Sequence, residues 1–373
     1  MNALRVAVDA TPLLGHRTGV GTFVAGALGA LAGDDELDLS AYALSLRGRT
    51  ALPAHLPPGV RAVRRPMAAG PLLQTWARAD TPPVEWWTGP VDVVHGTNFC
   101  VPPARHAGQI VTVHDLTPLR FAHLATAATR IFPALVRRAL RRGAHVHTPS
   151  AFVAAEVVEL LGAHPDRVHA VHHGVPVPSP AGTAGHGGPV HVDGPYVLAL
   201  GTVEPRKGLP DLVAAFDAVA AEHPDARLVV AGPDGWGVEA FEAAVGRARA
   251  ASRIVRLGYV DKTGADGLLR GAAVLAFPSL YEGFGFPPLE AMAVGVPVVA
   301  ARAGAVPEVL GDAARLVPPG DPQALAEALV LVLGDAGERD RLVARGRAHV
   351  ATFSWERCAA RLTAVYRQAV EVA

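Results

Sequence analysis

Two glutamates eight positions apart lie in the segment with the strongest chemical signal. Glu282 and Glu290 flank residues 283–289, Gly-Phe-Gly-Phe-Pro-Pro-Leu, which follow an apolar run ending at Phe277. Adjacent prolines suit the start of a helix but not its interior, so we expect Glu282 in a loop and Glu290 in the first helical turn. Glycines allow close backbone approach, and a helix start favours an anion. The segment predicts an anion site, unless it is an ordinary turn whose glutamate complements the helix dipole.

A pair of basic residues forms the second candidate. Arg206 and Lys207 follow the apolar run 196–200 after a short Gly-Thr-Val-Glu-Pro stretch. A guanidinium binds phosphate through its planar fork and an ammonium as a point charge, so the pair could hold two phosphates. Lysine occurs in this chain at positions 207 and 262 alone, against 32 arginines, which favours a function for Lys207. The alternative is a solvated turn with two ordinary basic residues.

The first half of the chain carries weaker signals. Gly19 and Gly21 lie in a Thr-Gly-Val-Gly stretch after the first apolar run. Gly-x-Gly alone is a weak phosphate-loop pattern, and the P-loop pattern is absent. His114 directly follows the apolar run 109–113. Parallel α/β sheets bind ligands at the carboxyl ends of their strands, which favours a functional His114, although a lone histidine is more often structural.

Both halves alternate short apolar runs, turns and amphipathic segments, which predicts βα units and parallel sheets. The expected strands are 5–9, 91–95, 109–113, 145–148, 168–171, 196–200, 227–231, 254–257, 273–277, 297–300 and 315–317. The expected helices are 20–32, 127–142, 150–162, 209–222, 238–250, 263–271, 288–294, 322–333, 338–350 and 354–370. The Gly- and Pro-rich residues 174–195 predict a linker. We therefore expect an α/β protein with two Rossmann-like domains, 1–178 and 195–353, joined by a linker over 179–194.

Composition excludes several classes of protein. The chain has 373 residues, of which 50% are hydrophobic, and its 34 Lys and Arg balance 34 Asp and Glu. Wholesale disorder and bulk nucleic-acid binding are therefore not expected. Two cysteines, Cys100 and Cys358, form no disulfide framework or metal spacing, which favours a reducing compartment. No signal-peptide core or long apolar run is found, so we expect a cytoplasmic protein with at most peripheral membrane contact.

Taken together, these segments resemble the retaining, GT-B-fold glycosyltransferases of family 4 over nearly the whole chain. The glutamate pair 282/290 is the most specific part of the resemblance. The other similar segments are 18–21, 95–98, 114–115, 148–150, 173–175, 201–208, 231–232, 257–260 and 304–308. The resemblance implies an acceptor-binding N-terminal domain, a donor-binding C-terminal domain across a cleft, and a last helix, 354–373, that crosses back to the first domain.

The resemblance also implies roles for individual residues. Arg206 and Lys207 would hold the donor diphosphate, Glu290 the ribose hydroxyls, and Glu282 the transferred sugar. His114 would lie beside that sugar, Gly19 or Gly21 would approach the diphosphate, and the amides of Phe284, Gly285 and Phe286 would contact sugar and phosphate. Many members carry an arginine where this chain has Thr202, so Arg206 supplies the second cation or the phosphate contact is weaker. No metal or other cofactor is expected, and no Asp-x-Asp triplet occurs.

The resemblance favours a mannosyltransferase that uses GDP-mannose, with a UDP- or ADP-sugar donor as the near alternative. A nicotinamide-dependent oxidoreductase and a silent sugar-binding relative are more distant ones. The acceptor would be a glycan, a lipid-linked or a small molecule. Trp76, Trp86 and Trp87 could stack on a sugar or pack in the core. The basic amphipathic stretch 130–142 could lie on an anionic membrane or be an ordinary packed helix.

Overall fold

The computed structural model describes residues 3–15, 18–121, 129–176 and 192–371. These form two compact units, and each is described by itself. Unit 1 comprises Met1–Gly174 with Phe353–Ala373, and unit 2 comprises Val175–Thr352. Most of the predicted linker 179–194 lies outside the described residues, which resume at 192.

Unit 1 is built on a parallel sheet of seven strands in the order β3-β2-β1-β4-β5-β6-β7. The strands are β1 (Leu4–Asp9), β2 (Leu37–Tyr42), β3 (Arg61–Ala62), β4 (Val93–Gly96), β5 (Gly108–Thr112), β6 (His145–Thr148) and β7 (Val168–Ala170). β2 and β3 are additions to the strands expected from the sequence. Strand order reverses direction between β1 and β4, which is where Rossmann-like sheets bind ligands.

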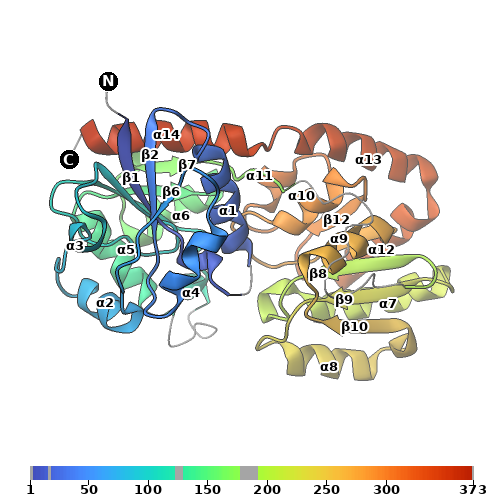
Figure 1. Cartoon of the computed structure of the whole chain (residues 1–373). Coiled ribbons are helices and arrows are strands. Elements are labelled where there is room, and N and C mark those ends of the chain that lie inside the picture. Colours follow the sequence, from blue (N-terminus) through green and yellow to red (C-terminus); the bar gives the residue numbers. More distant parts are fainter. Residues whose placement is uncertain (1–2, 16–17, 122–128, 177–191, 372–373) are drawn as a thin grey trace. The chain divides into compact units, whose positions relative to one another are not determined.

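Helices cover both faces of this sheet (Figure 1). On one face lie α1 (Gly19–Leu31) and α14 (Trp355–Glu371), which pack against each other, and α14 also contacts β4 and β5. The other face packs against the apolar sides of α2 (Ala69–Trp76), α5 (Phe132–Arg141) and α6 (Ala151–Leu161). The short helices α3 (Glu85–Thr88) and α4 (Thr117–Arg120) complete the unit. Unit 1 therefore needs a helix from the far end of the described chain to cover its sheet.

A chain of hydrogen bonds crosses the face under α14. Tyr366 Oη lies 2.9 Å from His95 Nδ1, and His95 Nε2 lies 2.8 Å from Thr112 Oγ1. Thr112 Oγ1 lies 3.0 Å from His147 Nδ1, and His147 Nε2 lies 3.1 Å from the carbonyl oxygen of Val171. A carbonyl only accepts, so His147 Nε2 donates, and its neutral ring accepts from Thr112 at Nδ1. It follows that His95 donates to Thr112 and accepts from Tyr366, which fixes the tautomers of both rings.

Unit 2 has a second parallel sheet, of six strands in the order β10-β9-β8-β11-β12-β13. The strands are β8 (Tyr196–Leu200), β9 (Arg227–Ala231), β10 (Ile254–Gly258), β11 (Val274–Phe277), β12 (Val298–Ala301) and β13 (Arg315–Val317). All six were expected to within one residue at each end. Their apolar runs lack polar alternation because helices cover both faces of a parallel sheet.

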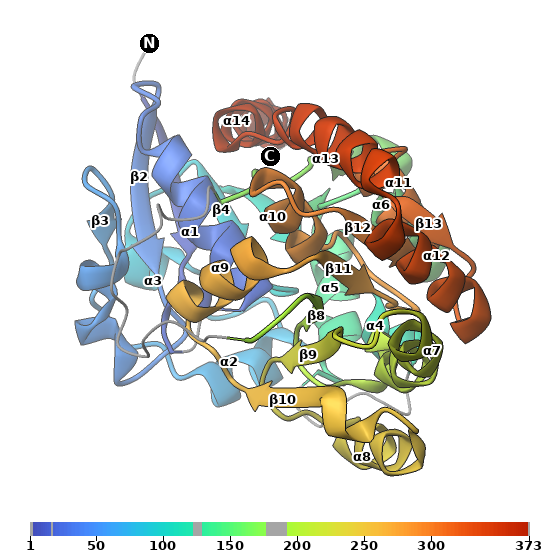
Figure 2. The same ribbon diagram turned by 90° about the vertical axis from the view of Figure 1, so that its right-hand side faces the viewer.

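The helices of unit 2 form two layers (Figures 1 and 2). One face of the sheet packs against α7 (Leu209–Glu222), α8 (Val238–Arg247) and α12 (Pro322–Gly334). The remaining helices are α9 (Lys262–Gly271), α10 (Phe286–Ala293), α11 (Val306–Leu310) and α13 (Ala336–Val350), and α10 packs against α9, α13, β11 and β12. The predicted α/β architecture of two Rossmann-like sheets is confirmed. Across the described residues, no helix combines the length and apolar character that a membrane span requires.

Candidate functional site

Four charged side chains gather where β8 and β11 end in unit 2. Arg206 and Lys207 occupy the 3₁₀ turn Pro205–Lys207 after β8, and Glu282 belongs to the loop after β11. Lys207 Nζ lies 2.6 Å from Glu282 Oε1, and an Arg206 guanidinium nitrogen lies 3.1 Å from Glu282 Oε2. Arg206 Nε also lies 2.8 Å from Glu204 Oε2. The structure thus brings the basic pair together with Glu282, which the sequence analysis singled out separately.

Backbone contacts fix this cluster from both sides. Leu280 N donates to the carbonyl oxygen of Arg206 at 2.7 Å, which ties the two loops to each other. Ala305 N donates to the carbonyl oxygen of Glu282 at 2.9 Å. A Cβ atom at Gly304 would lie 2.5 Å from that same oxygen, so this close approach requires glycine. The segment 304–308 belongs to the resemblance, which implied no role for Gly304. In the structure, Gly304 allows the backbone to pass close to Glu282.

Gly208 ends the turn that holds both cations. Its φ is +63°, and a Cβ there would lie 2.3 Å from the carbonyl oxygen of Pro278. We expect Gly208→Ala to lower the free energy of unfolding of unit 2. The loss should exceed the about 1–2 kcal/mol that the left-handed conformation alone costs a residue with a side chain. Urea unfolding monitored by circular dichroism measures the change.

The matched control is Gly246→Ala in α8, where nothing lies within 4 Å of an added Cβ. Alanine is favoured over glycine inside a helix by about 0.5–1 kcal/mol, so this variant should be slightly more stable. Equal midpoints for the two variants would contradict the role given to Gly208.

The electrostatics keep Glu282 ionised. Burial alone would raise the pKa of its carboxyl, but the charges of Lys207 and Arg206 and the hydrogen bond from Lys207 outweigh burial and lower the pKa to about 2. Lys207 Nζ also lies 5.3 Å from the centre of the Phe277 ring, a cation–π contact. The cluster therefore combines two fixed cations with a carboxylate that stays charged at neutral pH.

The second glutamate of the motif has a separate environment. Glu290 lies in α10, and its side chain is 15% exposed. Lys262 Nζ at the start of α9 lies 3.9 Å from Glu290 Oε1 and forms an ion pair with the buried Asp266 one turn later. Burial and the negative charge of Asp266 raise the pKa of Glu290, whereas the positive charge of Lys262 lowers it. The net effect is a raised pKa. Both lysines of the chain therefore pair with a glutamate of the same motif.

One expectation about this motif is wrong. We expected α10 to begin at 288, with Glu290 in the first turn, but α10 begins at Phe286 and Glu290 lies in its second turn. The first-turn N–H groups of a helix make no intrahelical bonds, so Pro287 and Pro288 fit inside that turn. The same prolines remove two possible N–H donors from the helix start.

The aromatic loop before α10 is largely buried. Phe284 is 6% exposed and makes an edge-to-face contact with Phe286, with ring centres 5.3 Å apart. Gly285 has φ +105°, which side chains rarely adopt. The predicted roles of these three backbone amides stay predictions.

In unit 1, His114 lies after β5 and is partly buried. Its Nε2 lies 2.8 Å from the carbonyl oxygen of Thr97 and therefore donates to it, which leaves Nδ1 as the acceptor of a neutral ring. Burial lowers the pKa of His114 despite the contributions of Thr97 and Asp115. Such a nitrogen can accept a hydrogen bond from a hydroxyl group, and the predicted role of His114 beside a sugar stays a prediction.

The glycine pair lies in the first turn of α1. Gly19 is exposed and Gly21 is buried, and the side chain of the N-cap residue Thr18 makes no capping hydrogen bond. A helix start without a side-chain cap can offer N–H groups to an anion. The predicted contact of Gly19 or Gly21 with a diphosphate is untested.

Most of the tryptophans 76, 86 and 87, and part of the basic stretch 130–142, contact other residues of unit 1. Trp76 is 1% exposed, and its Nε1 donates to Pro82. Trp87 Nε1 donates to Pro66, whereas Trp86 is 55% exposed. In the basic stretch 130–142, α5 buries its apolar side, and Arg138 in α5 and Arg142 directly after it form ion pairs with Asp80.

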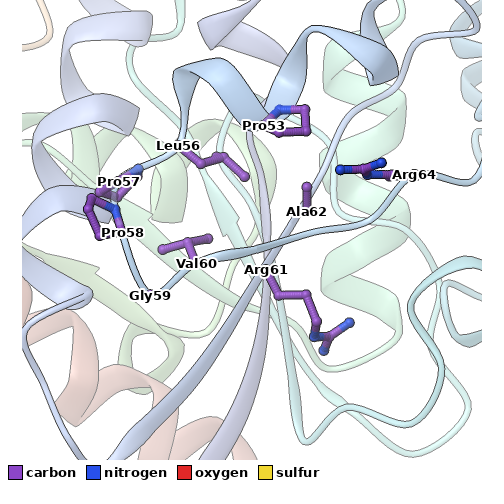
Figure 3. Close-up of a pocket in the computed structure, with 9 residues that line it drawn as sticks. All are labelled: Pro53, Leu56, Pro57, Pro58, Gly59, Val60, Arg61, Ala62 and Arg64. Carbon is purple, nitrogen blue, oxygen red and sulfur yellow. The ribbon is translucent and has the colours of Figure 1, made fainter.

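A groove of about 520 Å³ lies beside the edge strand β3 (Figure 3). Arg61 and Arg64 flank it, and residues 53 and 56–60 form its apolar part. None of the predicted site residues lines this groove. A much smaller hollow in unit 2 is lined by Gly201, Lys207, Phe277 and their neighbours.

Two family models match this chain in succession. The model described as "Glycosyltransferase Family 4" matches residues 18–177, and the model described as "Glycosyl transferases group 1" matches residues 194–335. The chain belongs to glycosyltransferase family 4. The second match contains every member of the charged cluster, and the first contains His114.

Curated relatives of this chain include two mannosyltransferases. An O-antigen chain mannosyltransferase B from Escherichia coli is 36% identical over 176 residues, 46% of this chain and 45% of the relative. An MMP alpha-(1->4)-mannosyltransferase from Mycolicibacterium hassiacum is 49% identical over 107 residues, 28% of this chain and 26% of the relative. The chain thus aligns with less than half the length of either relative.

Solved structures match this chain over nearly its whole length. Sucrose-phosphate synthase from Thermosynechococcus elongatus superposes with a TM-score of 0.73 at 20% identity, covering 99% of this chain and 100% of that one. Anabaena HepE in complex with UDP and glucose superposes with a TM-score of 0.70 at 18% identity, covering 98% and 100%. At this identity the match concerns the fold, and the predicted GT-B fold is confirmed.

Proposed function

We propose that this protein transfers a hexosyl group from a nucleotide sugar to a hydroxyl group of an acceptor. The observation that carries the proposal is the convergence of Arg206 and Lys207 on one buried carboxylate at the carboxyl ends of β8 and β11. Two oriented cations at this edge of a Rossmann-like sheet suit the two phosphates of a nucleotide sugar. The chain's membership of family 4 supports the same reaction class.

The proposed chemistry demands stabilisation of a leaving group. The bond from the anomeric carbon to the phosphate oxygen breaks, and its electron pair stays on the diphosphate. The acceptor oxygen forms the new bond at that carbon, and its proton passes to the departing phosphate. Fixed cations aimed at the growing negative charge lower this barrier without reorganising. We propose that Arg206 and Lys207 act in this way, with retention at the anomeric carbon and without a metal ion.

Glu282 and Glu204 have a different part in the proposal. They balance the charges of Arg206 and Lys207, so the cluster is neutral before a ligand arrives. We propose that Glu282 holds the cations in place and accepts hydrogen bonds from hydroxyl groups of the transferred sugar. Its low pKa, about 2, suits a group that accepts but does not donate.

The proposed donor is GDP-mannose. The two mannosyltransferase relatives support the sugar, and their alignments cover part of each chain only. A UDP-sugar is the second candidate, because HepE, which has the same fold, was solved with UDP and glucose. The proposed acceptor is a glycan, a lipid-linked or a small molecule. Arg138 and Arg142 of the stretch 130–142 form ion pairs with Asp80, and the proposal does not include membrane docking through this stretch.

A thermal-shift panel followed by a product assay tests the proposal. The panel contains GDP-mannose, GDP, UDP-glucose, UDP, ADP-glucose and NAD, and a ligand at 100 times its Kd should add about 2.7 kcal/mol of stability. We expect the GDP compounds to stabilise most. Sugar release from GDP-mannose, measured in the presence of a chelator, and the anomeric configuration of the product complete the test. Stabilisation by NAD alone, or by no nucleotide, would overturn the proposed function.

A further inference from the structure

We propose that Lys262 is a positioning residue that keeps Glu290 in the ionised form which the ribose of the donor requires. The inference rests on the proposed function and deepens it. Lys262 lies outside the segment 282–290 that contains both glutamates of the motif. It belongs to α9, whereas Glu290 belongs to α10.

The geometry defines how Lys262 is held. It is the first residue of α9, whose N-cap Asp261 accepts a hydrogen bond from Gly264 N at 2.8 Å. One turn along, the 4% exposed Asp266 binds the ammonium group. Nζ then lies 3.9 Å from Glu290 Oε1. Lys262 is thus fixed at its backbone and at its charged end, with the ammonium group between two carboxylates.

The choice of residue at this position is informative. The chain uses arginine at 32 of its 34 Lys and Arg positions. Its two lysines each lie within ion-pair distance of one glutamate of the 282/290 motif. A compact ammonium group places a full charge at a point, whereas a guanidinium spreads it over a wide fork. A point charge suits a position between the two carboxylates of Asp266 and Glu290.

The chemical need follows from the two hydroxyl groups of a ribose. A carboxylate accepts hydrogen bonds at both oxygens, whereas a protonated carboxyl must donate one of its own. Glu290 is mostly buried and close to the negative Asp266, and both conditions raise its pKa. Lys262 is the one group among the causes of that shift which favours the charged form. On the other side of α10, α13 brings the Arg347 guanidinium against Gly295, beyond the end of α10.

The test is the pH dependence of donor binding by the full chain. Calorimetry measures the Kd of the nucleotide sugar that the panel selects, between about pH 5.5 and 8.5, where its diphosphate diester does not titrate and Glu282 stays ionised. For Lys262→Met we expect affinity close to wild type at the alkaline end and about tenfold weaker at the acid end, because without the ammonium group more of Glu290 is protonated there. Lys262→Arg should restore part of the wild-type profile.

Asp266→Asn supplies the opposite change. It removes the negative charge that raises the pKa of Glu290 and keeps an oxygen that can bind Lys262. Donor affinity should therefore begin to fall at a lower pH than in the wild type. Glu290→Gln should bind weakly with no pH dependence in this range. A loss in Lys262→Met that is equal at every pH, or shifts of the same sign in Lys262→Met and Asp266→Asn, would overturn the inference. Failure of the wild type to bind any nucleotide sugar would instead overturn the proposed function.

Discussion

Lys207→Met is expected to lower kcat by about 10²–10³, the usual effect of removing one oriented donor from a developing negative charge. The proposed reaction places that charge on the diphosphate beside Lys207 and Arg206. Donor KM should rise less than kcat falls, because the contact strengthens as the bond breaks. Steady-state kinetics with the donor chosen by the nucleotide panel measure both constants. Wild-type turnover would contradict the phosphate contact.

A second variant separates catalysis from folding. Lys207→Met removes a partner of Glu282, which is 7% exposed. Breaking a buried ion pair from one side costs about 3–5 kcal/mol, so the single variant should unfold at lower urea concentration. Lys207→Met combined with Glu282→Gln also removes the carboxylate that has lost one of its two cations, and it should recover much of that stability. We expect kcat of the double variant to stay low although its stability recovers, so that a folded protein without these two side chains is inactive.

Mild acid is expected to unfold unit 1 while unit 2 resists. His95, His147 and His173 are at most 2% exposed. Burial lowers the pKa of His95 from 6.5 to about 3 and holds the pKa values of His147 and His173 well below 6.5. The unfolded chain therefore binds more protons below about pH 6.5, so stability is complete above that pH and falls as the pH falls. At pH 5 the His95 ring alone should cost unit 1 about 2 kcal/mol, a large share of a domain's stability, and His147 and His173 act in the same direction.

Urea unfolding at pH 7.5 and at pH 5 tests this expectation. Tryptophan fluorescence reports mainly on unit 1, which holds Trp76, Trp86, Trp87 and Trp355, whereas Trp236 is the fifth tryptophan and belongs to unit 2. The fluorescence midpoint should move to lower urea at pH 5, and circular dichroism should retain a second, less sensitive transition.

His95→Gln is the informative variant for the acid transition. The glutamine amide can accept from Tyr366 and donate to Thr112, as the neutral ring does, but it takes up no proton. The slope of stability against pH should fall by about 1.4 kcal/mol per pH unit. His106→Gln, on the exposed His106, is the matched control and should leave the slope unchanged. An unchanged slope in His95→Gln would contradict the assigned cause.

The strands of unit 2 were predictable because their residues face apolar surroundings on both sides. The run Tyr196–Leu200 has no polar residue to suggest a loop or a solvent face, and β8 has those bounds. β2 escaped prediction because Leu37–Tyr42 contains Asp38 and Ser40, and Asp38 is exposed near the start of the strand. Pattern reasoning reads such a strand as polar, although its last four residues are buried.

The charged cluster was predictable residue by residue but not as an arrangement. Arg206, Lys207 and Glu282 each follow a predicted strand, yet the sequence does not show that β8 and β11 are neighbours in the sheet. Lys262 illustrates the limit more sharply. The sequence shows that lysine is rare in this chain, but the spacing of Lys262 and Glu290 does not predict a contact between them. The packing of α9 against α10 brings the two side chains together.

The packing of α14 on unit 1 has a consequence for synthesis of the protein. Trp355 fits against two glycines, since a Cβ at Gly26 or at Gly174 would lie within 2.5 Å of its atoms. The ribosome makes all of unit 2, Val175–Thr352, between the rest of unit 1 and this helix. At ordinary elongation rates that interval is roughly 10–40 s. During it the face that carries His95 and His147 lacks one of the two helices that cover it, so we expect the nascent first unit to offer chaperones an apolar, proton-sensitive surface until α14 emerges.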